Sequence, residues 1–276
     1  MEKQTTKRSQ KGKTLIILGF VSIAFLFLLY SRYQESELIT LGSTEPIQRL
    51  AIAFYVVLIM AFGAVSFGLY QFHKYKVEEN EKGILSIIAI STWNNKARKI
   101  FVITLIIYGI FFSLASGTLV YQPEVDFSHH YGAEIPSAFI SPCCDQPGYM
   151  PKIIIYLTEH IGLQIIPINL VLQVTVSYLV GLNAAIAYTA FSISKKGRSA
   201  SSIGAATGLF IACPTCAGSF LSLFVGTASG IALTIALAQL QTLFIAISLP
   251  ILFVMPIIIA RKLRNPDGSC AVEPKK

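Results

Sequence analysis

Long apolar runs dominate this chain of 276 residues. A run of about 18 or more apolar residues is typical of a membrane-spanning helix, because a helix satisfies its own backbone hydrogen bonds in lipid. Only 13% of the residues are charged, about half of the usual fraction in a soluble domain. We therefore predict an all-α polytopic membrane protein, a bundle of about six transmembrane helices. The apolar runs lie near 14–30, 49–70, 100–121, 164–192, 202–226 and 231–260.

The positions of lysine and arginine predict the orientation of these spans. With the N-terminus in the cytoplasm, the inner segments carry 19 basic residues and the outer segments carry 3. This excess follows the positive-inside rule, so we expect both termini to be cytoplasmic in a cell-membrane protein. The net charge of +8 is then a topology signal and requires no nucleic-acid partner. The partners that we expect are the lipid bilayer, membrane subunits or an extracytoplasmic thiol protein.

The spans and loops divide the chain into five parts. The inner loop 71–99 contains the apolar stretch 83–93, which we expect to form an interfacial helix on the inner leaflet. Residues 226–240 are either part of the last span or a short surface helix. The five parts are a cytoplasmic N-terminus at 1–13, a three-span half at 14–121, an extracytoplasmic loop at 122–163, a second three-span half at 164–260 and a cytoplasmic tail at 261–276.

The extracytoplasmic loop 122–163 is the largest segment predicted to face water. Five prolines argue against long regular structure before residue 152. For residues 152–163 we expect a short amphipathic helix on the outer surface.

The tetrapeptide Cys213-Pro214-Thr215-Cys216 lies inside an uncharged apolar run. Thiolates are soft metal ligands and redox nucleophiles, and Pro214 should kink or break a helix. A stripe of small residues at i+4 spacing precedes Cys216, so we expect this thiol on a face that packs against another helix. The alternative is that both cysteines only pack, as alanine would.

Polar side chains line one predicted span at Asn169, Gln173 and Ser177, with Asn183 further along. Polar residues in a span usually face the interior of the bundle. We expect this stripe to face Cys216. Its role is either to hold helices together or to line a transport path.

The extracytoplasmic loop supplies a second cysteine pair, Cys143-Cys144. The same loop contains His129, His130 and Met150. Adjacent cysteines can form a disulfide, or they can bind a soft cation with imidazole and thioether ligands. A purely structural disulfide and two unpaired thiols are the alternatives. Disulfides are stable on this side of the membrane.

The run GLFIACPTCAGSFLSLFVG at 208–226 resembles a late-span pattern in poorly characterised, chiefly archaeal, multi-pass membrane proteins. These carry Cys-Pro-x-Cys followed by small and leucine-rich residues. More loosely, the plan is similar to that of membrane thiol oxidoreductases, which combine a span-associated C-x-x-C with a second cysteine pair in an outer loop. The pair in this chain is expected deeper in the membrane than theirs.

Three hypotheses about function follow. In a thiol–disulfide relay, the catalytic residues are Cys213, Cys216, Cys143 and Cys144, which exchange electrons through mixed disulfides. In soft-metal binding or transport, with copper as the natural ion, the ligands are those four cysteines together with His129, His130 and Met150. In the third hypothesis the protein is a non-catalytic scaffold or an accessory subunit. Whether the protein is an enzyme is left open.

Overall fold

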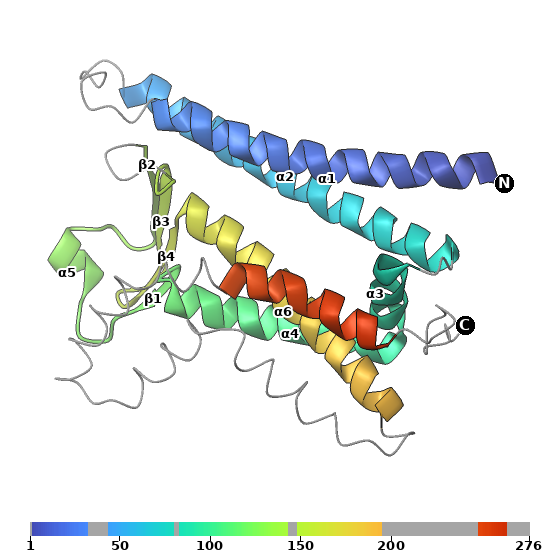
Figure 1. The fold of residues 1–276 in the computed structure, drawn as a ribbon. Coiled ribbons are helices and arrows are strands. Elements are labelled where there is room, and N and C mark those ends of the chain that lie inside the picture. The colour runs from blue at the N-terminus through green and yellow to red at the C-terminus, as the bar shows by residue number, and fades with distance from the viewer. Residues whose placement is uncertain (1, 33–43, 80–82, 143–147, 195–247, 264–276) are drawn as a thin grey trace. The chain divides into compact units, whose positions relative to one another are not determined.

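The computed structural model describes residues 2–32, 44–79, 83–142, 148–194 and 248–263. They form two compact units, which are described separately. The described fold is mostly helical and contains one antiparallel sheet (Figure 1). The first unit comprises Met1–Tyr75 and Ile110–Val174, and the second comprises Lys76–Gly109 and Thr175–Lys276.

Four described helices are long and apolar enough to cross a membrane. They correspond to the first four predicted spans, so the prediction of a membrane protein with several apolar helices is supported. Residues 248–262 form a further helix within the last predicted span, and the predicted span 202–226 lies outside the described residues. The four helices are α1 (Glu2–Ser31), α2 (Thr44–Glu79), α4 (Asn95–Ala115) and α6 (Pro167–Ser194).

In the first unit, α1 and α2 approach closely where both helices carry glycine. A Cβ added to Gly68 would lie 2.9 Å from the Gly12 carbonyl oxygen, and one added to Gly19 would lie 2.4 Å from a methyl group of Val65. Small residues allow such close backbone packing between membrane helices. The hairpin is therefore held by van der Waals contact along much of its length.

A four-stranded antiparallel sheet lies in the chain between α4 and α6. Its strand order is β1-β4-β3-β2, so the first and last strands are neighbours. β1 follows the end of α4, and β4 leads into the start of α6. The strands are β1 (Leu119–Tyr121), β2 (Ser137–Ser141), β3 (Lys152–Tyr156) and β4 (Ile161–Ile165), and the short helix α5 (Phe127–Tyr131) lies between β1 and β2.

The sheet corrects our expectation of an all-α fold and of a helix at 152–163. The prolines at 136, 142 and 151 flank the strands, where no ladder hydrogen bond is lost. Three consecutive β-branched residues, Ile153–Ile155, favour a strand over a helix. The predicted span 100–121 is also shorter than expected, because its last residues form β1.

The two faces of the sheet contact different elements. Ile153 and Ile165, which are register partners, pack against the cluster of buried side chains on α1 and α2. Tyr156 and its partner Gly162 lie on the opposite face, where both contact Phe127 of α5. The sheet thus separates α5 from α1 and α2.

In the second unit, α3 (Ile84–Trp93) packs into a helical core. Its Ile87 and Ile88 join Leu182 and Ile186 of α6 and Ala260 of helix 248–262. The sequence correctly predicts a helix here. The expected placement on a membrane surface would leave one face uncovered, whereas all side chains from 86 to 92 are buried.

Candidate functional site

The predicted cysteine pairs, Cys143-Cys144 and Cys213/Cys216, lie outside the described residues. Cys270, to which we assigned no role, does so too. The structure does describe the residues that flank Cys143-Cys144, and it describes His129, His130 and Met150. We therefore build the candidate site from these surroundings.

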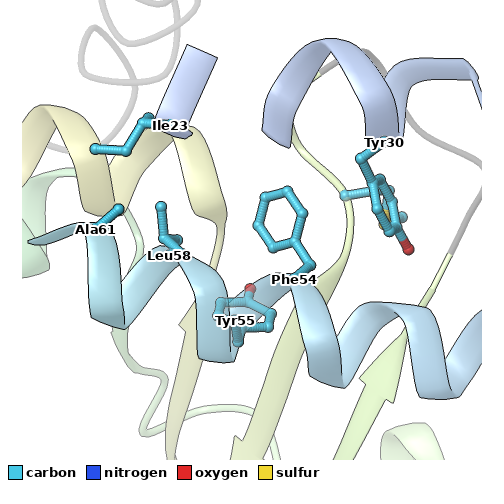
Figure 2. Close-up of a cluster of buried hydrophobic side chains, with 7 residues drawn as sticks. Ile23, Tyr30, Phe54, Tyr55, Leu58 and Ala61 are labelled. Atoms are coloured by element: carbon cyan, nitrogen blue, oxygen red, sulfur yellow. The ribbon is translucent and has the colours of Figure 1, made fainter. Parts of the chain in front are cut away.

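The residue before Cys143 is held by α1. The Tyr30 hydroxyl donates a hydrogen bond to the Pro142 carbonyl at 2.5 Å. Tyr30 itself is 3% exposed and packs edge-on against Phe54 of α2, with ring centroids 5.1 Å apart (Figure 2). The end of β2 is thus fixed to the α1–α2 hairpin immediately before the cysteines.

The chain after the cysteines is held at three points. Ile168, in the first turn of α6, donates its N–H to the Gly148 carbonyl at 3.1 Å, which satisfies one donor that a helix start leaves free. Met150 is 5% exposed in the α1–α2 core. The Tyr55 hydroxyl lies 2.6 Å from the Pro151 carbonyl and 2.9 Å from the Ile165 carbonyl.

The two tyrosines that contact the sheet, Tyr30 and Tyr55, belong to the buried cluster shown in Figure 2. Phe54 and Tyr55 are adjacent on α2 and their rings are in edge contact at 5.6 Å. Edge-to-face aromatic pairs contribute about 0.5–1.5 kcal/mol beyond the area that they bury. The Tyr30 and Tyr55 hydroxyls lie at the edge of the cluster and donate hydrogen bonds to carbonyls at the ends of the strands.

The two predicted histidine ligands lie elsewhere. His129 and His130 are exposed on α5, and the His130 ring packs edge-on against Tyr131. Because α5 covers one face of the sheet and Met150 packs on the other, the structure does not bring these histidines together with Met150. Among the residues that the structure describes, no three His, Cys, Asp or Glu side chains form a group that could hold a metal ion.

A third histidine of this segment is tied to the backbone. Nδ1 of His160 lies 3.0 Å from the Val125 carbonyl. Since a carbonyl only accepts, we assign the Nδ1 proton to this bond. The contact fixes the β3–β4 turn to the chain that enters α5.

Two carboxylates accept hydrogen bonds from Ser128 at the start of α5. The Ser128 N–H donates to Glu159 at 3.2 Å, and the Ser128 hydroxyl donates to Asp126 at 3.0 Å. A proton shared with the neighbouring Glu159 carboxyl and hydrogen bonds from Ser128 hold the pKa of Asp126 below its usual value. This arrangement stabilises the turn and offers no buried acid or base.

The polar stripe on α6 contacts α4 in the described structure. Gln173 donates to the Ser113 hydroxyl at 2.6 Å, and Asn169 lies 3.4 Å from the Ser116 carbonyl. Ser177 lies beside Gly109, whose added Cβ would be 3.7 Å from the Ser177 hydroxyl. Of the two roles that we left open, helix-to-helix contact accounts for these bonds.

A further polar contact, in the second unit, was missed at the sequence level. Asn183 is 3% exposed and donates to the Leu252 carbonyl at 3.0 Å. In a regular helix that carbonyl would accept from residue 256, but Pro256 has no N–H. The sequence shows that Pro256, four residues after Leu252, leaves this carbonyl without its helical donor. Only the fold shows that the Asn183 side chain lies within hydrogen-bond distance of it.

No protein-family model, no curated protein and no solved structure matches this chain.

Proposed function

We propose that this membrane protein is a thiol–disulfide relay that uses Cys143-Cys144 at its outer site and Cys213/Cys216 within the membrane. The observation that supports it best is the attachment on both sides of Cys143-Cys144. Tyr30 holds Pro142 before the pair, and Tyr55 holds Pro151 after it. Both tyrosines belong to one packed cluster on α1 and α2.

Attachment of this kind suits thiol exchange. The attacking thiolate must approach the partner disulfide along its S–S axis, and the product of the attack is a mixed disulfide. A cysteine pair that is held in place on both sides loses less conformational freedom in reaching this geometry. A loop that only connects two strands has no need of two buried tyrosine hydroxyls. A scaffold role accounts for the sheet but leaves the placement of its anchors around the cysteines without a purpose.

The proposed reaction moves two electrons from a dithiol protein through the two cysteine pairs to an extracytoplasmic disulfide protein. A thiolate of Cys213/Cys216 attacks the Cys143–Cys144 disulfide and forms a mixed disulfide. The second thiol of the inner pair resolves it, which leaves two outer thiols and one inner disulfide. Two electrons have then moved outward. The outer thiols reduce a disulfide of an extracytoplasmic protein, and a dithiol protein reduces the inner disulfide again.

The proposal includes the predicted topology, with six spans and both termini in the cytoplasm. The distribution of basic residues supports this orientation. It places the sheet and Cys143-Cys144 on the side where disulfides persist. The resemblance to Cys-Pro-x-Cys membrane proteins is consistent with it and adds no activity of its own.

A redox titration of the purified full chain tests this function. Free thiols are labelled with a mass-tagged alkylating reagent at a series of glutathione potentials, and bound metal is measured on the same sample. The relay predicts two-electron steps that Cys143→Ala and Cys213→Ala each abolish for their own pair. Stoichiometric copper on permanently reduced thiols would instead support soft-metal binding. Thiols that are reduced and metal-free at every potential would leave the scaffold role.

A further inference from the structure

Five cationic side chains gather at one end of the second unit. Three of them lie in the first turns of α4, and two lie in the last turn of helix 248–262. All five are exposed. We call them the cation cluster: Lys96, Arg98, Lys99, Arg261 and Lys262.

Packing on α3 brings the two groups to the same end. Phe101, two residues after Lys99, packs against the buried cluster that contains Ile87 and Ile88. Ala260 and Leu263, which flank Arg261 and Lys262, belong to that same buried cluster. The cations of both helices therefore project from the region around one small apolar core.

The described residues offer this cluster little negative charge. Glu78 and Glu79, at the end of α2, are the only two acidic residues among the described residues of the second unit, and no member of the cluster forms an ion pair among the described residues. The first turn of α4 has no acidic residue. Positive charge there also opposes the helix dipole. An anion from outside the described residues would therefore be attracted to this cluster.

The surface next to the cluster is apolar. Lys99 is followed on the same face of α4 by Ile103 and Ile107, which are 56% and 63% exposed. Trp93 ends α3 just before α4 begins, and tryptophan is enriched at the level of lipid headgroups. Cations, tryptophan and an exposed apolar face follow one another within a short stretch of chain.

We propose that the cation cluster binds the phosphate headgroup of an anionic membrane lipid, with an acyl chain along the exposed face of α4. A free phosphate ion would use the cations alone and leave the apolar face without a role. The charge complementarity and the adjoining apolar face together favour the lipid. This inference does not depend on the relay.

Lipid retention tests the proposal on the purified full chain. The protein is mixed with phosphatidylglycerol in neutral detergent, and bound lipid is counted by native mass spectrometry, with phosphatidylcholine as the comparison lipid. We expect retained phosphatidylglycerol, and an affinity that falls about fivefold for each cation neutralised near the membrane surface. The double variant Lys96→Gln/Lys99→Gln should therefore bind about 25-fold more weakly. Arg261→Gln/Lys262→Gln should do the same and repeats the test on a different helix.

The control removes the same charge elsewhere. Lys11→Gln/Lys13→Gln neutralises two exposed lysines on α1 and should leave lipid retention within twofold of the starting protein. The charge-preserving Lys96→Arg/Lys99→Arg variant should keep it as well. Equal loss in the α1 variant would overturn the proposal, since it would indicate nonspecific charge attraction. Equal competition by glycerol phosphate or inorganic phosphate would overturn it too, because the ligand would then be a free anion.

Discussion

Asn183 of α6 donates its side-chain N–H to the main-chain carbonyl of Leu252, at 3.0 Å in the interior of the second unit. The carbonyl is available because Pro256 removes the helical donor that would occupy it. A carbonyl without a partner in a membrane interior costs several kcal/mol. The polar side chain on one helix thus compensates a proline on another.

Replacement of Asn183 by alanine should destabilise the protein by about 0.6–1.7 kcal/mol, between the average and the maximum found for hydrogen bonds between membrane helices. The free energy of unfolding in mixed micelles of detergent and denaturing surfactant measures this cost. In a Pro256→Ala background the restored helical N–H can reach Leu252. The same Asn183→Ala change should then cost clearly less, because the Leu252 carbonyl keeps a hydrogen-bond donor. The packing volume lost at Asn183 is the same in both backgrounds, so the double-mutant cycle removes it from the comparison. Equal costs in both backgrounds would show that Asn183 does not compensate the donor that Pro256 lacks.

Replacement of Gly68 by alanine should weaken the α1–α2 hairpin. The new Cβ would lie 2.9 Å from the Gly12 carbonyl, and overpacking of this kind typically costs 1–3 kcal/mol. Gly63→Ala is the matched control on the same helix, because a Cβ there meets nothing within 4 Å. It should be neutral or stabilising, since alanine is the better helix former. Thermal unfolding of both variants compares the two sites, and similar losses would argue against the close contact.

Removal of the Tyr55 hydroxyl should loosen the sheet. Tyr55→Phe leaves the Pro151 and Ile165 carbonyls without this donor, which should cost about 1–3 kcal/mol if they stay buried. Hydrogen exchange in β3 and β4 reports the loss locally. Tyr121→Phe is the control, because Tyr121 is 64% exposed and its hydroxyl has no hydrogen bond among those the structure describes. Unchanged exchange in the Tyr55 variant would show that the hydroxyl does not anchor the sheet.

Acid should release the start of α5. The pKa of Asp126 is lowered in the folded protein by a proton shared with the Glu159 carboxyl and by hydrogen bonds from Ser128. A lowered pKa means that the carboxylate stabilises the fold above the unfolded value of 3.8 and that this contribution is lost as the pH falls through the folded value. The hydrogen bond from the Ser128 hydroxyl to Asp126 should therefore be lost as the pH falls below 3.8, and an NMR titration of the Asp126 carboxyl measures this directly. Ser128→Ala removes the hydroxyl donor and should move the Asp126 midpoint up toward 3.8, and an unshifted midpoint would contradict the assignment.

The sequence predicts the first four long apolar helices because their signal is local. Runs such as 49–70 and 164–192 are long and apolar wherever they lie in the fold, and only a helix satisfies such a backbone in lipid. The apolar helix at 83–93 was found for the same reason. Its burial was not, because burial of Ile87 depends on α6 and on Ala260 far along the chain.

The sheet is not predicted because its strands are short and because the prolines before residue 152 argue against long regular structure there. Pro136 and Pro142 in fact bracket β2, and the run Ile153–Ile155, which forms β3, lies in the stretch 152–163 for which we expected an amphipathic helix. Pairing of β1 with β4 joins residues that lie 40 to 44 positions apart, which no local pattern indicates. The anchoring roles of Tyr30 and Tyr55 likewise depend on carbonyls that lie 96 to 112 positions away in the chain, which no local pattern indicates.

The central claim is that electrons pass between the two cysteine pairs, and trapping of the mixed disulfide tests it most directly. In the four variants that keep one outer and one inner cysteine, with the other two changed to serine and Cys270 to alanine, mild oxidation is followed by alkylation and peptide mass spectrometry. The relay predicts that at least one variant yields a disulfide-linked peptide pair joining Cys143 or Cys144 to Cys213 or Cys216. Reductant should remove that peptide pair. Absence of any such linked peptide in all four variants, with both thiols recovered alkylated, would contradict the relay.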